Sequence, residues 1–236
     1  MDLEAKGFIE TSFLDWDGKV VSVVFLPFCN FRCPFCHNAG LIENPDSYET
    51  VPASKILDFV MTHRDFIDGV CFTGGEPSLH KGRGLKEFMG KLKEEGFKVK
   101  LDTNGTDPGL IAELIDEKLV DFIAMDVKGP LDDRYEKLSG VRTDISSIRR
   151  SIETIIKSGI DHEFRTTVVP GLLNIKDIED VAKELKGAKR LVLQQFVPKN
   201  TWDESLRGRD PLPLERMEAK LALCRKYVPD TIIRGV

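Results

Sequence analysis

Six short apolar segments, rich in β-branched residues, alternate with amphipathic segments of helical length along most of the chain. The predicted strands occupy residues 20–27, 69–75, 98–105, 121–129, 161–171 and 189–198. The predicted helices occupy residues 54–64, 84–96, 108–118, 144–159, 174–187 and 214–227. Repeated βα units indicate a parallel sheet with right-handed crossovers, which forms either an open doubly wound sheet or a barrel.

The residues best suited to chemistry follow the predicted strands. Three cysteines follow the first strand, "GGEP" the second, "DTNG" the third and "DVKG" the fourth. Chemistry gathered from successive strand ends is typical of a barrel, whereas a Rossmann sheet concentrates its signal in one glycine-rich turn. We therefore predict a single-domain α/β fold, a partial (β/α)6 TIM-like barrel over residues 1–236. Its core spans about 18–200, and a C-terminal helix and strand extension spans 201–236.

Composition limits the classes of function. The chain has 236 residues, 41% of them hydrophobic, which is enough for a sizeable core, and a formal net charge of −5. That charge argues against nucleic acid as a partner. Apolar runs are too short to span a membrane, and the N-terminus lacks the basic and apolar regions of a signal peptide. We therefore expect a cytoplasmic protein, whose thiols stay reduced and serve metal or redox chemistry.

Cys29, Cys33 and Cys36 form a C-x3-C-x2-C pattern. An iron–sulfur cube is held by such thiolates, whereas a structural zinc site needs a fourth ligand. His37 adjoins Cys36 and would join the same tetrahedron only with difficulty. The pattern alone leaves zinc and iron–sulfur open. Two further cysteines, at 71 and 224, fall inside apolar strand and helix patterns and are expected to be small buried hydrophobes.

The stretch "CNFRCPFC" resembles the cluster loop of the radical S-adenosylmethionine (SAM) superfamily. The resemblance implies a [4Fe–4S] cluster on Cys29, Cys33 and Cys36, with one iron open to the amino and carboxylate groups of SAM. An electron from the cluster then cleaves the sulfonium and releases a 5′-deoxyadenosyl radical, which abstracts hydrogen. Phe35 matches the aromatic residue near the adenine, although plain core packing is the alternative. His37, in the "CHN" that ends the loop, is counted with the cofactor contacts.

"TGGEP" resembles the superfamily motif that receives the methionyl ammonium group of SAM. Paired glycines let backbone come close to a ligand. The resemblance assigns Gly74, Gly75 and Glu76 to cofactor binding. A Gly-Gly turn is common by itself, so the motif gains its meaning from its order after the cysteine loop.

"LDTNG" and "MDVK" resemble segments of the glycyl radical enzyme activases, including the activase of pyruvate formate-lyase. In these enzymes, aspartates and neighbouring oxygens hold a monovalent cation, Na⁺ or K⁺, beside the carboxylate of SAM. The matching positions are Asp102, Thr103, Asp126 and the Val127 carbonyl. Lys128 is expected to add a charge-assisted hydrogen bond to the cofactor. The alternative for Asp102 is an Asx-turn that caps "TNG".

"FRTTVVPG" resembles the fifth-strand segment of the same activases. Arg165 would then point into the barrel, toward the nucleotide or the substrate backbone, and a surface salt bridge is the alternative. The pyruvate formate-lyase activase has a cofactor-contacting histidine after its sixth strand. Here "LQQFVP" places Val197 or a neighbour at that position, and this departure puts a polar contact from the sixth strand in doubt.

The N-terminal stretch, from "FIETSFLDWDGK" to "CHN", looks most like the branch named anaerobic ribonucleoside-triphosphate reductase activating proteins. The implied reaction is abstraction of a glycine α-hydrogen from a partner, either an anaerobic ribonucleotide reductase or a pyruvate formate-lyase-like protein. The implied electron donor is a flavodoxin or ferredoxin. No side chain beyond the cluster and SAM is expected to be catalytic, and no membrane or nucleic-acid partner is expected.

Two other functions stay open at this point. A radical SAM enzyme acting on a small molecule, similar to the 7-carboxy-7-deazaguanine synthases, would have comparable length and a glycine-rich second-strand motif. A zinc or iron–sulfur module that only scaffolds or carries electrons would require the motifs at four strand ends to be coincidence. A glycyl radical on a partner separates the activase from the first, and SAM turnover separates it from the second.

Overall fold

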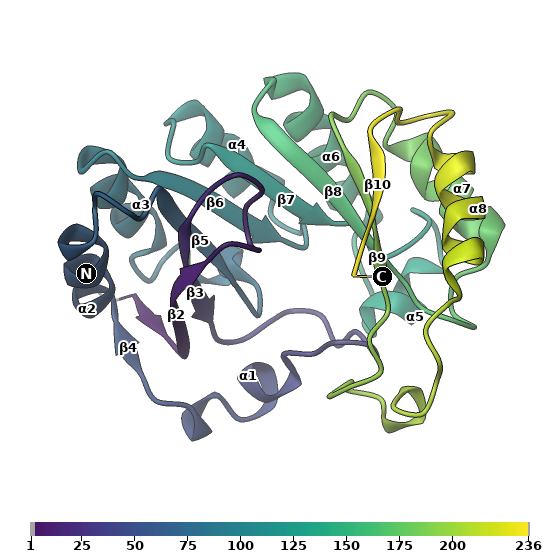
Figure 1. Cartoon of the computed structure of the whole chain (residues 1–236), viewed down its shortest axis with the longest axis horizontal. Coiled ribbons are helices and arrows are strands. Elements are labelled where there is room, and N and C mark those ends of the chain that lie inside the picture. Colours follow the sequence, from purple (N-terminus) through teal and green to yellow (C-terminus); the bar gives the residue numbers. More distant parts are fainter. Residues whose placement is uncertain (1–2, 236) are drawn as a thin grey trace. The chain divides into compact units, whose positions relative to one another are not determined.

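The computed structural model describes residues 3–235 (Figure 1). These residues form two compact units. The first unit comprises residues 3–30, 40–103 and 109–123, and the second comprises residues 31–39, 104–108 and 124–235. The predicted domain limits, 1–236 with a core of 18–200, reach beyond the described residues and stay a prediction.

Strands β6, β5, β3 and β2 lie side by side in that order in the first unit. Their bounds are β2 Gly7–Ser12, β3 Val21–Leu26, β5 Gly69–Gly74 and β6 Lys98–Thr103. β3, β5 and β6 are parallel, as predicted from their β-branched runs, and β2 adds an unpredicted antiparallel strand beside β3. A separate two-stranded sheet pairs β1 (Glu4–Ala5) with β4 (Val51–Pro52).

Helix α3 packs on one face of this sheet, and a smaller apolar cluster packs on the other. The helices are α1 Ala39–Glu43, η1 Pro45–Ser47, α2 Ala53–Thr62, η2 Pro77–His80, α3 Leu85–Glu94 and α4 Pro108–Asp116, of which α1 and α4 each begin with one residue of the second unit. Leu85, Phe88, Met89 and Leu92 give α3 a buried stripe at helical spacing, and Phe88 packs edge-on against Phe72 of β5. The preceding residue of β5, Cys71, points the other way and packs with Trp16, Val21 and Val23.

Strands β10, β9, β8 and β7 lie in that order in the second unit. Their bounds are β7 Phe122–Asp126, β8 Asp161–Val168, β9 Leu191–Gln195 and β10 Thr231–Arg234, of which β7 has its first two residues in the first unit. β8, β9 and β10 are parallel. The helices are α5 Tyr135–Ser139, α6 Ile145–Ser158, α7 Ile175–Glu184, η3 Glu204–Leu206 and α8 Leu214–Cys224.

Local sequence explains where the main helices of this unit begin. The Asp144 side chain accepts a hydrogen bond from the Ser146 N–H at the start of α6. Asn174 and Asp177 form a capping box at the start of α7. α8 and β10 are the helix and strand expected in the extension 201–236, and Cys224 is fully buried in α8, as expected for a small hydrophobe.

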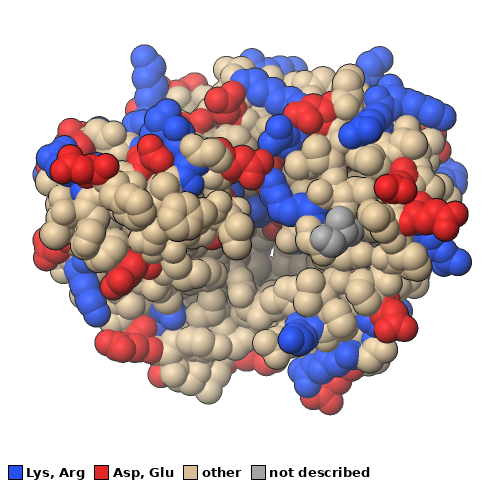
Figure 2. All heavy atoms as spheres, viewed as in Figure 1, with Lys and Arg blue, Asp and Glu red and all other residues tan. Residues whose placement is uncertain are grey.

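The candidate residues lie at or just after the C-terminal ends of β3, β5, β6 and β7. On the face shown in Figure 2, basic and acidic side chains are interspersed over the surface. Within residues 3–235, no helix combines the length and the apolar character needed to cross a membrane.

Candidate functional site

The two glycines after β5 pack against the chain that leads to Cys29. The Gly75 N–H donates to the Leu26 carbonyl, and the Glu76 N–H donates to the Phe28 carbonyl, each at 2.8 Å. A Cβ at Gly75 would overlap the Phe28 carbonyl oxygen. Phe28 itself has a φ of 64°, which is uncommon outside glycine. This glycine therefore allows close approach of backbone to backbone, at the entry to the cysteine loop.

Glu76 and Thr103, both predicted to contact the cofactor site, are in direct contact. The Thr103 hydroxyl donates to Glu76 Oε1 at 2.7 Å, and the Ser78 N–H donates to the same oxygen at 3.0 Å. Glu76 is 1% exposed. The carboxylate is thus fixed by the end of β6 and by the first turn of η2.

Asp102 is paired with a lysine that the sequence analysis did not single out. Lys100 Nζ lies 3.1 Å from Asp102 Oδ1 and donates to the Asp15 carbonyl at 2.5 Å. The Cys71 thiol also contacts Asp102 Oδ1, at 3.8 Å. Residues two apart on a strand share a face, so the spacing K-x-D was the signal for this pair. In the second unit, Asn104 Oδ1 accepts a hydrogen bond from the Thr106 N–H at 3.0 Å. The role of Asp102, cation ligand or Asx-turn cap, stays a prediction.

In the second unit, the turn that carries Cys33 and Cys36 is held by backbone contacts. The Cys36 N–H donates to the Cys33 carbonyl at 3.0 Å, and the Arg32 N–H donates to the Ser139 carbonyl at 2.7 Å. Gly140, the residue after Ser139, has a φ of +70°, and a Cβ at this position would overlap the Arg32 carbonyl. Phe35, between the cysteines, is 6% exposed, and its predicted place near adenine stays a prediction.

The thiols of this turn are suited to binding a positively charged metal centre. Burial raises the pKa of Cys33 to about 11 against a partial opposing effect of the Lys128 ammonium, and burial also raises the pKa of Cys36. Buried thiolates therefore need added positive charge, which iron supplies. None of the five cysteines forms a disulfide with another described residue. Among residues 3–235, no three histidine, cysteine or acidic side chains lie close enough together to hold a metal ion. The three-cysteine ligand set therefore rests on the sequence pattern.

Asp126, Lys128 and Arg165 form an ion-paired group at the end of β7 and on β8. Lys128 Nζ lies 3.1 Å from Asp126 Oδ2, and Arg165 Nε lies 2.8 Å from Asp126 Oδ1. Burial opposes ionisation of Asp126, but Arg165 and Lys128 outweigh it and lower its pKa to about 2. Burial alone would lower the pKa of Lys128, but Asp126 reverses this and raises it. The three side chains, one carboxylate and two cations, together have a formal net charge of +1.

The remaining predicted positions have defined partners. The Val127 carbonyl, a predicted cation ligand, accepts from the Thr166 hydroxyl at 2.8 Å. His37 Nε2 and the Val197 carbonyl oxygen lie 2.8 Å apart. The end of the cysteine loop therefore contacts a backbone atom two residues after β9. The Val197 side chain is 42% exposed. Tyr135 was not predicted: its hydroxyl accepts from the Lys128 N–H at 3.3 Å, and burial raises its pKa. Nothing in the sequence around Tyr135 indicated a contact with Lys128.

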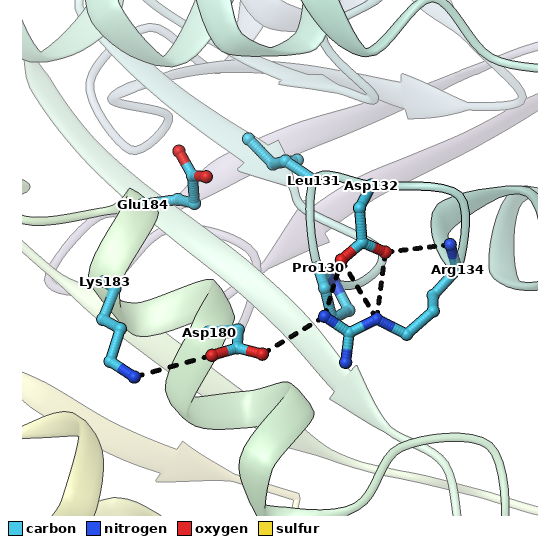
Figure 3. A pocket seen from close by; sticks show the side chains of 7 residues that line it. All are labelled: Pro130, Leu131, Asp132, Arg134, Asp180, Lys183 and Glu184. Carbon is cyan, nitrogen blue, oxygen red and sulfur yellow. Dashed lines mark hydrogen bonds and ion pairs between the residues drawn. The ribbon is translucent and has the colours of Figure 1, made fainter.

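A separate pocket of about 390 Å³ lies on the second unit, between the segment after β7 and helix α7 (Figure 3). Arg134 contacts Asp132, Asp177 and Asp180, and Lys183 contacts Asp180. The lining residues are Pro130, Leu131, Asp132, Arg134, Asp180, Lys183 and Glu184. These charges satisfy one another, and the pocket contains none of the predicted site residues.

Comparison with known proteins gives matches over most of the chain. Residues 23–185 match the family model described as Radical SAM superfamily. The chain is 36% identical, over 98% of its length and 95% of the relative's, to a protein of Methanocaldococcus jannaschii whose name as a glycyl-radical enzyme activating enzyme is itself provisional. It is 26% identical to the pyruvate formate-lyase 1-activating enzyme of Escherichia coli, over 87% of this chain and 88% of that one.

A solved structure supports the fold. A domain of pyruvate-formate lyase-activating enzyme from Bacteroides vulgatus has a TM-score of 0.56 and 18% identity, with 71% of this chain and 99% of that chain covered. At this identity the likeness bears on fold alone. With the parallel strands described above, it confirms the predicted α/β fold class of the partial-barrel type.

Proposed function

The chain belongs to the radical SAM superfamily, and we propose that it activates a glycyl radical enzyme. The observation that carries the proposal is the 36% identity, over 98% of the chain, to a relative named for that activity. The expected partner is an anaerobic ribonucleotide reductase or a pyruvate formate-lyase-like protein, and the second is favoured by the similarity to pyruvate formate-lyase activating enzymes. The "DTNG" and "MDVK" segments support the same assignment.

Cys29, Cys33 and Cys36 would hold the [4Fe–4S] cluster, and none of these thiols is consumed in a disulfide with a described residue. When bound, the cluster would supply one electron for the reductive cleavage of the C5′–S bond of SAM, which would yield methionine and a radical able to take a hydrogen atom from a glycine Cα. The products are methionine, 5′-deoxyadenosine and a glycyl radical, and the electron would come from a flavodoxin or ferredoxin. The protein side chains bind and orient the reactants, and none needs to transfer a proton.

The residues of each unit have distinct proposed tasks. In the first unit, Glu76, fixed by Thr103, would accept a hydrogen bond from the methionyl ammonium group. In the second unit, Arg165 and Lys128 would face the SAM carboxylate or the nucleotide, because Asp126 balances only one of their two charges. Phe35, His37 and the Val197 backbone would line the cofactor site. We also propose that the enzyme is cytoplasmic.

The test is an anaerobic assay of the reconstituted, reduced protein. With SAM added, 5′-deoxyadenosine should accumulate, and a candidate glycyl radical protein should acquire a glycyl radical signal in electron paramagnetic resonance. Cys33→Ala should abolish both signals, and Cys224→Ala should retain both, because it removes a buried thiol outside the cysteine loop. SAM cleavage without a radical on any glycyl radical protein would favour a small-molecule substrate. If the protein holds a complete, reduced cluster and still cleaves no SAM, the proposal is wrong.

A further inference from the structure

The carboxylates expected to hold a monovalent metal cation already have protein cations as partners. Asp102 is paired with Lys100 in the first unit, and Asp126 with Lys128 and Arg165 in the second. We propose that these ammonium and guanidinium groups replace the metal cation, so that this protein binds SAM without Na⁺ or K⁺. The inference rests on the proposed use of SAM but not on the identity of the protein partner.

Lys100 is built into the first unit as a fixed charge. It is 3% exposed, and its ammonium contacts Asp102 Oδ1 at 3.1 Å and the Asp15 carbonyl at 2.5 Å. The same nitrogen lies 5.7 Å from the centre of the Phe122 ring. A carboxylate, a carbonyl and an aromatic face are the groups that stabilise a buried cation. Lys100 is thus held by the kind of oxygen ligands that Na⁺ or K⁺ would use.

A metal ion at Asp102 would meet a charge of its own sign. Lys100 and Asp102 together are neutral, and Asp102 is 9% exposed, so water screens the ammonium poorly. Lys100 would repel a second cation on the same carboxylate at short range. The Lys100–Asp102 pair has no further negative charge to offset this repulsion. The pair therefore disfavours a metal ion in the place where the resemblance expects one.

The second unit disfavours a metal ion for a related reason. Both oxygens of Asp126 accept from cationic side chains, Oδ1 from Arg165 and Oδ2 from Lys128. The Val127 carbonyl, the other expected ligand from this segment, accepts from the Thr166 hydroxyl. Hard cations need several oxygen ligands, and here each oxygen already has a donor. The group keeps one net positive charge, which attracts an anion such as the SAM carboxylate and repels a cation.

The experiment measures SAM binding to the reconstituted protein by equilibrium dialysis, in chloride buffers of equal ionic strength that contain K⁺, Na⁺ or only N-methyl-D-glucamine. The wild-type dissociation constant should differ by less than about twofold among the three buffers. Dialysis with ⁸⁶Rb⁺ as a K⁺ analogue should show no bound ion, with or without SAM. A loss of about tenfold or more in N-methyl-D-glucamine, or one bound ⁸⁶Rb⁺ per chain, would overturn the inference.

A matched pair of variants tests Lys100 itself. Lys100→Met keeps most of the length of the side chain but removes the ammonium that pairs with Asp102, so SAM binding should weaken about tenfold in N-methyl-D-glucamine and recover when K⁺ is added. Lys98→Met makes the same change at an exposed position on β6 and should behave as wild type. A loss in Lys100→Met that K⁺ does not restore would contradict the replacement. If that variant does not fold, the wild-type measurements still decide.

A failure of the inference differs from a failure of the proposed function. Salt-dependent SAM binding overturns the inference alone and leaves the activase assignment intact. The absence of a glycyl radical on any partner overturns the activase assignment alone, because SAM binding does not require the partner. No SAM binding in any buffer would overturn both.

Discussion

The carboxylates at the ends of β6 and β7 differ in partners and in exposure. Asp102 is paired with the Lys100 ammonium, and both residues are at most 9% exposed. Asp126 has two cationic partners, and its side chain is 30% exposed. A neutral, buried pair has no charge with which to attract a ligand, whereas an accessible group with a surplus positive charge does. The comparison indicates that the Asp102 pair sets the electrostatics of its strand end and that the Asp126 group contacts the ligand.

The largest expected effect comes from breaking the buried pair. Asp102→Ala leaves the Lys100 ammonium without its counter-ion and should lower the free energy of unfolding by about 3–5 kcal/mol. Asp126→Ala should cost less, about 1–2 kcal/mol, because water reaches that group. Urea unfolding of the two variants measures the difference.

A double variant is the control for this pair. Lys100→Met combined with Asp102→Leu replaces the two charges by apolar groups and should recover most of the stability lost in Asp102→Ala, since a buried ion pair and well-packed apolar residues are often equivalent. If Asp126→Ala were the more destabilising single change, the assignment of Asp102 as the closed, structural pair would be wrong.

The next effect tests the surplus charge of the Asp126 group. Arg165→Met should weaken SAM binding about tenfold, since it removes the cation that Asp126 does not balance, and Arg165→Lys should retain part of the affinity. Arg190→Met is the matched control, because Arg190 pairs with Asp230 near the start of β9. Equilibrium dialysis with SAM gives the comparison, and equal losses in both methionine variants would argue that Arg165 acts only through stability.

The sequence predicted the six parallel strands because their short apolar, β-branched runs are buried and alternate with segments of helical length. It missed β2, whose residues "GFIETS" are only partly buried, and the five-residue helices α1 and α5, which are too short to show periodicity. The C-terminal ends of β3, β5, β6 and β7 carried the motifs, so the order of the candidate residues followed from the order of the strands.

The partners of the candidate residues were less predictable. The Lys100–Asp102 pair could have been predicted, since a lysine two residues before an aspartate on a strand lies on the same face of the sheet. The Arg165–Asp126 and His37–Val197 contacts join residues 39 and 160 positions apart and depend on tertiary packing. The sequence suggested a contact with the nucleotide or the substrate for Arg165 and left a surface salt bridge as the alternative. The structure pairs Arg165 with Asp126 in a partly buried site.

A smaller effect should appear in the pH dependence of stability. The pKa of Asp126 is about 2 in the folded protein and about 3.8 ordinarily. A lowered pKa stabilises the folded state above the ordinary pKa, and this contribution disappears as the pH falls from about 4 to about 2. With allowance for solvent screening, it amounts to about 1 kcal/mol. The difference in unfolding free energy between wild type and Asp126→Asn should shrink over this range, and a difference independent of pH would contradict the ion-paired state.

The smallest effect is expected at Asp132, which tests whether a low pKa alone marks a stabilising carboxylate. Hydrogen bonds from Arg134 lower the pKa of Asp132 to about 2, as low as that of Asp126, but the Asp132 side chain is 49% exposed. Water and salt screen such a pair, and Arg134 keeps Asp177 and Asp180 as partners. Asp132→Asn should therefore change the free energy of unfolding by less than about 0.5 kcal/mol, and high salt should remove the difference. A loss as large as that of Asp126→Asn would mean that exposure does not separate these two carboxylates, and the contrast between Asp102 and Asp126 would then need another cause.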